Sequence, residues 1–192
     1  SIMSLSLAGS TAGVRILAEP MKNYYRETAA GHNRLSFFLG GVWAGMYRMI
    51  VAVYAFCTFN HFIPGFGFSF GDFYYTYLAS YWCMYAIAGP ISVLCSKRNA
   101  PLIASLTGIT CGIFSGFVDY PQKHLSFGFY TAQSMHLMHD GVIENSMDST
   151  YERWGYEDLH PGYGAFINIC WGLIVYALAF VLLVVVNKEK QR

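Results

Sequence analysis

The chain has 192 residues, of which 55% are hydrophobic and 12% are charged, and its formal net charge is +1. Four apolar stretches fill roughly half of this length, which leaves no room for a soluble catalytic domain of ordinary size. The near-zero charge and the lack of a basic cluster with interleaved aromatic residues exclude nucleic acid as a partner.

The first element in chain order is an apolar stretch of 17 residues, Ile2 to Ala18, rich in Gly, Ser and Thr. It lacks the layout of a signal peptide, because it has no basic start and Arg15 stands near its end. As a span it is marginal. We expect a partial apolar helix over 1–18, the cytosolic end of a helix that begins upstream.

The second element is a predicted interfacial connecting helix over residues 21–40. Its basic residues Lys22, Arg26 and Arg34 can reach lipid headgroups, while the aromatic residues and Leu35 face inward. The alternative interpretation is an ordinary polar connector between two apolar stretches.

Four transmembrane helices follow from the long apolar stretches. At about 1.5 Å of rise per residue, 18 to 25 residues cross a hydrocarbon core about 30 Å thick. The predicted spans are 35–59, 73–95, 101–118 and 163–186. The prediction is therefore an all-α polytopic membrane protein with a single membrane domain over residues 1–192.

Arg48, in the first span, is the one charged residue within the four stretches. An ionised group at membrane depth should face protein or water and have a partner. It either lines a polar path or pairs with a neighbouring helix for structural reasons. Because the spans of this chain hold no acidic residue, we expect the partner to come from another chain.

Glycines at four-residue intervals mark two predicted helix-packing surfaces. Such glycines share one helix face and allow a neighbouring backbone to approach closely. The first span carries Gly41 and Gly45, and the third carries Gly108, Gly112 and Gly116.

The long segment 119–162 is predicted to hold a re-entrant or amphipathic helix over 125–143, followed by a polar loop. Within it, two imidazoles and two carboxylates lie close together at a spacing that tolerates a divalent metal. These weak candidates are His136, His139, Asp140 and Glu144. The alternative is the wetted face of an amphipathic helix, and a membrane enzyme built on this cluster is a third, minor hypothesis.

The distribution of charge predicts the orientation. If the spans alternate in direction, nine basic residues lie on one side and two, Lys123 and Arg153, on the other. This excess is a strong positive-inside signal, so both termini should face the cytosol, or the matrix or stroma of an organelle. The nine residues are Arg15, Lys22, Arg26, Arg34, Lys97, Arg98, Lys188, Lys190 and Arg192.

The cysteines and histidines indicate no cofactor. All five cysteines fall within the spans, where they are most simply small buried hydrophobic residues. All six histidines fall outside the predicted spans, which makes haem ligation by two intramembrane histidines an unfavourable interpretation. We expect no cofactor and no catalytic residue, but bound lipids.

Short motifs follow one another in a distinctive order. Tyr24-Tyr25-Arg26-Glu27 precedes the run 35–40, Leu-Ser-Phe-Phe-Leu-Gly, and Asn99-Ala100-Pro101 precedes the run 113–117, Ile-Phe-Ser-Gly-Phe. This order resembles the C-terminal part of the transmembrane domain of G-subfamily ATP-binding cassette transporters, the ABC-2 type membrane domain. The first two motifs look like its connecting helix, and the other two like the start and end of its fifth helix.

The resemblance extends over nearly the whole chain, from about Ser6 onward. Residues 125–147 resemble the re-entrant helices of the family, and 151–192 resemble its final external loop and sixth helix. Two features depart from the pattern. Gly41 stands where a lysine is common, and the external-loop cysteines of some members are absent.

The resemblance also implies parts that this chain does not contain. In the family, the nucleotide-binding domain and the first helix lie upstream, and the substrate path between two protomers is lined largely by helices two and five. The chain has no phosphate-binding loop, dinucleotide fingerprint or Gly-x-Ser-x-Gly motif. Any ATPase activity would therefore belong to a partner.

Two interpretations of function follow. The sequence favours a non-catalytic accessory subunit of a larger multi-subunit membrane complex, for instance in an organellar energy-transducing membrane such as the mitochondrial inner membrane. The alternative is the membrane half of an ATP-driven exporter of lipids or other amphipathic molecules in the plasma membrane. Both need partners: other membrane subunits in the first case, a nucleotide-binding subunit in the second.

Overall fold

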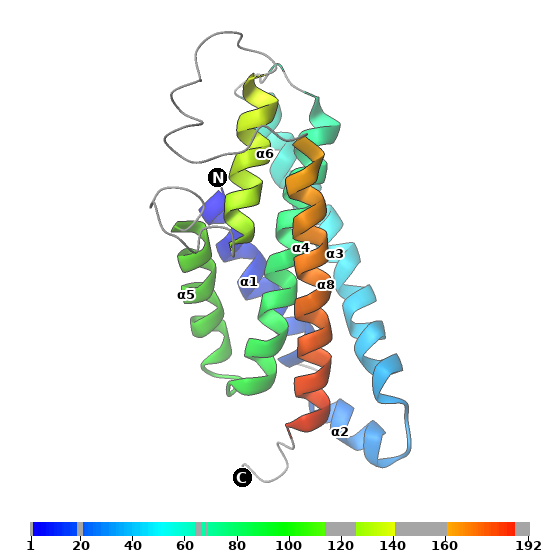
Figure 1. Ribbon diagram of the computed structural model, residues 1–192. Coiled ribbons are helices and arrows are strands. Elements are labelled where there is room, and N and C mark those ends of the chain that lie inside the picture. The colour runs from blue at the N-terminus through cyan, green and yellow to red at the C-terminus, as the bar shows by residue number, and fades with distance from the viewer. Residues whose placement is uncertain are drawn as a thin grey trace.

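The elements of the fold follow the apolar stretches of the sequence, and all of them are helices. The computed structural model describes residues 2–18, 21–63, 67, 69–113, 126–140 and 161–186, and within these ranges there is no strand. The helices pack side by side into an elongated bundle, with the short α2 at one end (Figure 1).

Three helices are long and apolar enough to cross a membrane. They are α3 (Arg34–Phe62), α4 (Phe70–Leu94) and α8 (Pro161–Val185). The predicted third span corresponds to α5 (Ala100–Ile113), which is apolar but has only 14 residues, or about 21 Å of rise. Residues 114–118 lie outside the described part of the chain, so three of the four predicted spans are confirmed by length and composition.

The predicted interfacial helix over 21–40 is wrong in its extent. The structure divides this segment into α2 (Met21–Ala29) and the start of α3, with a turn between them. Asn33 caps α3, because its side chain accepts a hydrogen bond from the backbone N–H of Leu35 at 2.9 Å. Leu35 itself is exposed rather than inward-facing.

Gly31 makes the turn between α2 and α3. Its φ of +90° lies in the left-handed region, and the N–H of His32 donates to the carbonyl of Glu27 at 2.9 Å. This arrangement closes the C-terminus of α2 in the way that glycine favours.

Gly31→Ala is expected to lower the free energy of unfolding by about 1 kcal/mol. A Cβ at this position meets no atom within 4 Å, so the cost comes from the backbone conformation alone. Gly40→Ala is the matched control, since Gly40 also has open space but lies inside α3. SDS-induced unfolding of the purified chain measures both variants. Equal stabilities would contradict the assignment of a left-handed backbone conformation to Gly31.

Helix α4 forms the centre of the bundle. Of its membrane-span residues, 67% are buried, against 28% in each of α3 and α8. It packs against α1 (Ile2–Ala18), α3, α5, α8 and α6 (Phe127–Asp140). Many of its buried positions are small residues, which allow five neighbours to approach one helix.

The N-terminal stretch, expected to be marginal as a span, is a helix packed within the bundle between α4 and α5. Glycines allow both contacts. A Cβ on Gly13 would lie 2.8 Å from the Cβ of Ala88 in α4, and a Cβ on Gly108 in α5 would lie 2.9 Å from the carbonyl oxygen of Ser6. The backbones of these helices therefore touch almost directly.

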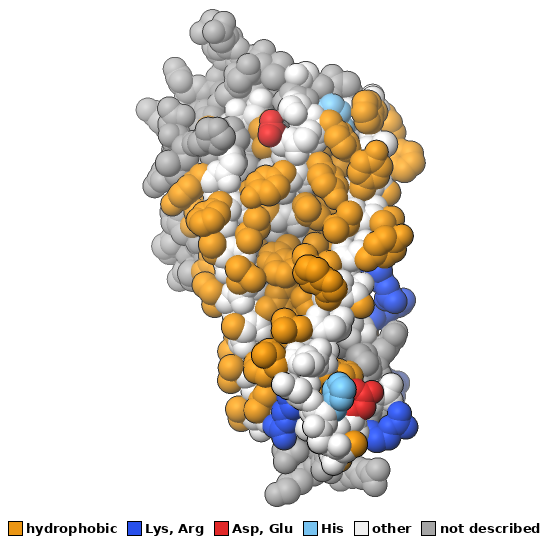
Figure 2. All heavy atoms as spheres, turned by 90° about the vertical axis from the view of Figure 1, so that its right-hand side faces the viewer, with side chains coloured by type: hydrophobic (Ala, Val, Ile, Leu, Met, Phe, Trp, Pro, Cys, Tyr) orange, Lys and Arg blue, Asp and Glu red, His pale blue; other side chains and the backbone are white. Residues whose placement is uncertain are grey.

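The outer surface of the bundle is apolar. Large hydrophobic side chains are exposed along α3, α5 and α8, among them Trp43, Leu106 and Leu178. Figure 2 shows this surface as a broad band of hydrophobic side chains, with Lys and Arg gathered toward the end that carries α2. A band of this kind matches the hydrocarbon core of a bilayer, as the composition predicts.

Candidate functional site

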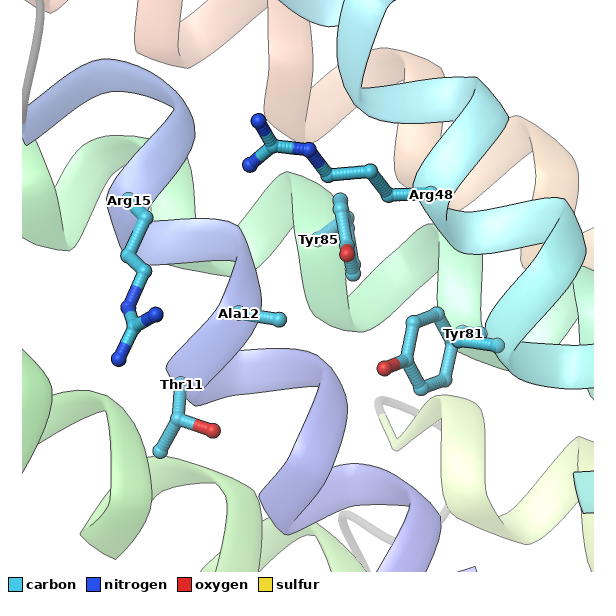
Figure 3. A pocket seen from close by; sticks show the side chains of 7 residues that line it. Thr11, Ala12, Arg15, Arg48, Tyr81 and Tyr85 are labelled. Atoms are coloured by element: carbon cyan, nitrogen blue, oxygen red, sulfur yellow. The ribbon is translucent and has the colours of Figure 1, made fainter.

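A pocket of about 420 Å³ lies between α1, α3 and α4 (Figure 3). It is the place where the single charged residue of the predicted spans meets polar groups of other helices. The lining residues are Thr11, Ala12 and Arg15 of α1, Arg48 and Ala52 of α3, and Tyr81 and Tyr85 of α4.

The directions of the helices bring the two arginines to this pocket. A side chain in an α-helix leans toward the N-terminus of its helix. Because α1 ends and α3 begins at the α2 end of the bundle, Arg15 leans into the membrane region and Arg48 leans back toward the α2 end. In Figure 3, Arg15 runs along α1 toward Thr11, and Arg48 reaches from α3 toward α1.

Close packing of α1 on α3 holds this geometry. A Cβ on Gly45 would clash with Ile16, and one on Gly41 would lie 3.9 Å from the same side chain. These contacts lie within one to two helical turns of Arg48, so they fix the separation of the helices that supply the two guanidinium groups.

The pocket is rich in positive charge and in hydrogen-bond donors. Both arginines are exposed at its mouth, whereas Tyr81 and Tyr85 are only 4% exposed and form its floor. Their rings pack together with centroids 5.1 Å apart. Among the described residues, no carboxylate pairs with Arg15 or Arg48. Arg48 therefore still needs a negatively charged partner.

A second polar cluster joins α4, α6 and α8. The hydroxyls of Ser80 and Thr131 are hydrogen-bonded to each other, and the side-chain N–H of Asn168 donates to the Thr131 hydroxyl at 3.1 Å. All three side chains are fully buried. The Cys83 thiol donates to the backbone carbonyl of Asn168 at 2.7 Å. The cluster therefore holds α6 against α4 and α8.

Thr131→Val is expected to lower the free energy of unfolding by about 1 kcal/mol, because the shape is kept while Ser80 and Asn168 lose a shared partner. Thr107→Val is the matched control, since the Thr107 hydroxyl donates to the Ile103 carbonyl of its own helix. The apparent melting temperature of each variant in detergent is the measurement. An equal effect at both positions would contradict a role in joining helices.

The structure places some of the other predicted residues and leaves others outside its description. Arg26 is exposed on α2 and Arg34 at the start of α3. The Tyr25 hydroxyl donates to the Val186 carbonyl at 3.4 Å, so α2 lies beside the end of α8. Gly112 of α5 faces Met3 of α1. Gly116 and the side chain of Lys22 lie outside the described residues.

The candidate metal ligands are only partly described. His136 is half-buried on α6, whereas Glu144 and the side chains of His139 and Asp140 lie outside the described part. No group of three or more His, Cys, Asp or Glu side chains comes together among the residues that the structure describes. The metal site remains a prediction.

One prediction about histidine is wrong. His61 does not lie outside the spans but in the last turn of α3, where it is buried against the rings of Phe70 and Phe73, with centroids 5.5 and 5.6 Å away. The helix continues past Phe59 because the aromatic residues of α3 and α4 bury this extra turn.

Comparison with known families now identifies the class of protein. Residues 1–143 match the ABC-2 type transporter family, so the chain belongs to that family. This confirms the ABC-2 type membrane domain that the order of the motifs suggested. ABC-2 membrane domains are transport domains that work with a nucleotide-binding partner, and they lie within the membrane.

A relative in Penicillium crustosum, the ABC-type transporter claG, is 27% identical over 114 residues. The aligned part makes up 59% of this chain but 15% of that protein. The chain therefore corresponds to a small part of the length of this relative.

Proposed function

We propose that the chain is the membrane half of an ATP-driven exporter of lipids or other amphipathic molecules, and that a nucleotide-binding partner supplies the energy. The observation that carries this proposal is the family match, which spans α1 to α6 and hence most of the bundle. The motif order further supports placing the chain in the G-subfamily.

The arrangement of the helices supports a docking place for that partner. Helix α2 lies beyond the spans, at the end of the bundle where α8 finishes and where Lys and Arg gather (Figures 1 and 2). In this proposal that end faces the cytosol, in agreement with the positive-inside rule, and α8 finishes there. Helix α1 begins away from that end, beside α6, so the structure does not place the start of the described chain on the same side as the end of α8, as the sequence had predicted for the two termini. A cytosolic ATPase would then contact α2.

The pocket beside Arg48 supports transport over a purely structural role. A cavity lined by charged side chains costs free energy in an otherwise apolar bundle, and such groups commonly mark a pathway or a ligand site. An accessory subunit without transport needs no such cavity. The accessory role, favoured by the sequence, is thus the second candidate.

Gentle purification from native membranes, followed by mass spectrometry, separates the two. The exporter proposal expects a nucleotide-binding polypeptide with a phosphate-binding loop in stoichiometric amount, either as a separate subunit or within a longer chain that contains this sequence. Co-purification with another large membrane assembly, without any nucleotide-binding polypeptide, would favour the accessory role and overturn the proposal.

A further inference from the structure

The pocket between α1, α3 and α4 has the chemistry of an anion site. Two guanidinium groups carry five N–H donors each, and the two phenols of its floor, which are hydrogen-bonded to each other, leave one O–H donor for a ligand. None of the lining side chains carries a negative charge. A ligand that fits must therefore bring several acceptor oxygens and negative charge.

Electrostatics favours an anion over a neutral molecule. Two like charges in one pocket repel each other, and a single arginine at the centre of a membrane already costs about 3 kcal/mol on insertion scales. Because no carboxylate among the described residues neutralises Arg15 or Arg48, a bound anion would remove both penalties. Guanidinium groups bind phosphate in a bidentate manner, which makes phosphate a better match than a single point charge.

The surroundings of the pocket favour a lipid as the source of the phosphate. Ala44 and Ala52 lie one helical turn before and after Arg48 on α3, and both are exposed. They leave a shallow strip beside the arginine, bordered by the large exposed side chains of Tyr47 and Val51. An acyl chain can lie on this apolar strip while its headgroup reaches the guanidinium groups.

We propose that this pocket binds the phosphate of an acidic phospholipid, a phosphomonoester such as that of phosphatidic acid, which enters from the bilayer between α1 and α3. A phosphomonoester carries between one and two negative charges near neutral pH, which matches two arginines better than a phosphodiester does. The site differs from the interfacial basic residues on α2, because it lies inside the membrane band. A role of this binding in export rests on the proposed function, whereas the binding of the lipid does not.

Binding is measured on the full chain in detergent, without nucleotide, by isothermal titration with dioctanoyl phosphatidic acid. Arg48→Gln is expected to weaken binding by about tenfold, the equivalent of one lost charge-assisted hydrogen bond. Arg48→Lys keeps the charge but loses the bidentate geometry, so we expect a loss of about threefold. Arg98→Gln, in the turn between α4 and α5 and outside the pocket, is the control and should bind like the wild type.

Two further probes identify the source of the phosphate. Dioctanoyl phosphatidylcholine and inorganic phosphate should each bind at least about tenfold more weakly than dioctanoyl phosphatidic acid. Equal binding of inorganic phosphate would overturn the lipid proposal in favour of a small-anion site, and equal binding of phosphatidylcholine would show that charge is not recognised.

Wild-type affinity in Arg48→Gln would also overturn the proposal. Should that variant fail to fold, Arg15→Gln, on the other wall of the pocket, must weaken binding by a similar factor. Because no nucleotide is present, these results are independent of the exporter proposal. Intact lipid binding without ATP-driven transport would count against the proposed function alone.

Discussion

Gly108→Leu is expected to lower the free energy of unfolding by about 3 kcal/mol and to separate α1 from α5. The first added atom would already lie 2.9 Å from the carbonyl oxygen of Ser6 and 2.8 Å from the Ser10 hydroxyl oxygen. A backbone oxygen cannot move away by a change of rotamer, so the helices themselves must part. SDS-induced unfolding of the purified chain gives the loss directly.

Gly40→Leu is the control for this substitution. Gly40 lies in α3 and a Cβ there meets nothing within 4 Å, so the same change of residue should alter stability by less than about 1 kcal/mol. If Gly108→Leu were as stable as Gly40→Leu, the close packing of α1 on α5 would be refuted. That packing is also what places α1, and hence Arg15, in the bundle.

Gly164→Leu is expected to have an effect of similar size on the opposite part of the molecule. A Cβ on Gly164 would lie 2.5 Å from the carbonyl oxygen of Tyr130 and would clash with the Ser134 hydroxyl. Helix α6 would therefore be pushed away from α8, and the hydrogen bond between Thr131 and Asn168 would break. We expect a loss of about 3 kcal/mol, concentrated in α6.

Hydrogen–deuterium exchange locates this loss. Peptides from Phe127–Asp140 should exchange faster in Gly164→Leu, while peptides from α3 should be unchanged. Gly71→Leu is the matched variant, because a Cβ at Gly71 makes only an ordinary contact of 3.6 Å with the Ser69 hydroxyl oxygen. Uniformly faster exchange across the bundle would show that α6 is not a separate, locally held element.

The spans were predictable because they depend on long apolar runs, which the sequence displays directly. The helical state of Ile2–Ala18 within the bundle was harder to predict, since its Gly, Ser and Thr residues lower its hydropathy. The same small residues allow the helix to be buried between its neighbours. The Thr11 hydroxyl donates to the Leu7 carbonyl of its own helix at 3.0 Å, and Gly13 allows contact with α4. The glycine spacing at Gly9 and Gly13 was the overlooked signal.

The site was predictable only in part, because tertiary structure assembles it. Arg48 stood out as a lone charge in a span, but its neighbours Arg15, Tyr81 and Tyr85 come from distant parts of the chain. No local pattern links residues that lie on three helices. The cluster around Thr131 was missed for the same reason, although Asn168, an amide within the last apolar stretch, was a usable signal.

The ends of the helices were predicted less well, because they depend on features that a local sequence pattern does not capture. Gly31 interrupts what reads as a continuous amphipathic segment, and it does so by adopting a backbone conformation that other residues rarely take. At the other end of α3, contacts with Phe70 and Phe73 extend the helix to include His61. In one case a backbone conformation and in the other tertiary contacts set the end of the helix, rather than the pattern of apolar residues.

Transport in proteoliposomes shows whether this chain is the membrane half of an exporter. The chain, together with its nucleotide-binding partner, would be reconstituted with a fluorescent lipid, and movement of that lipid across the bilayer would be followed with and without ATP. Movement of the lipid should require ATP hydrolysis and should stop with a non-hydrolysable analogue. Movement at the same rate without ATP, or none in a complex that hydrolyses ATP, would contradict the exporter proposal.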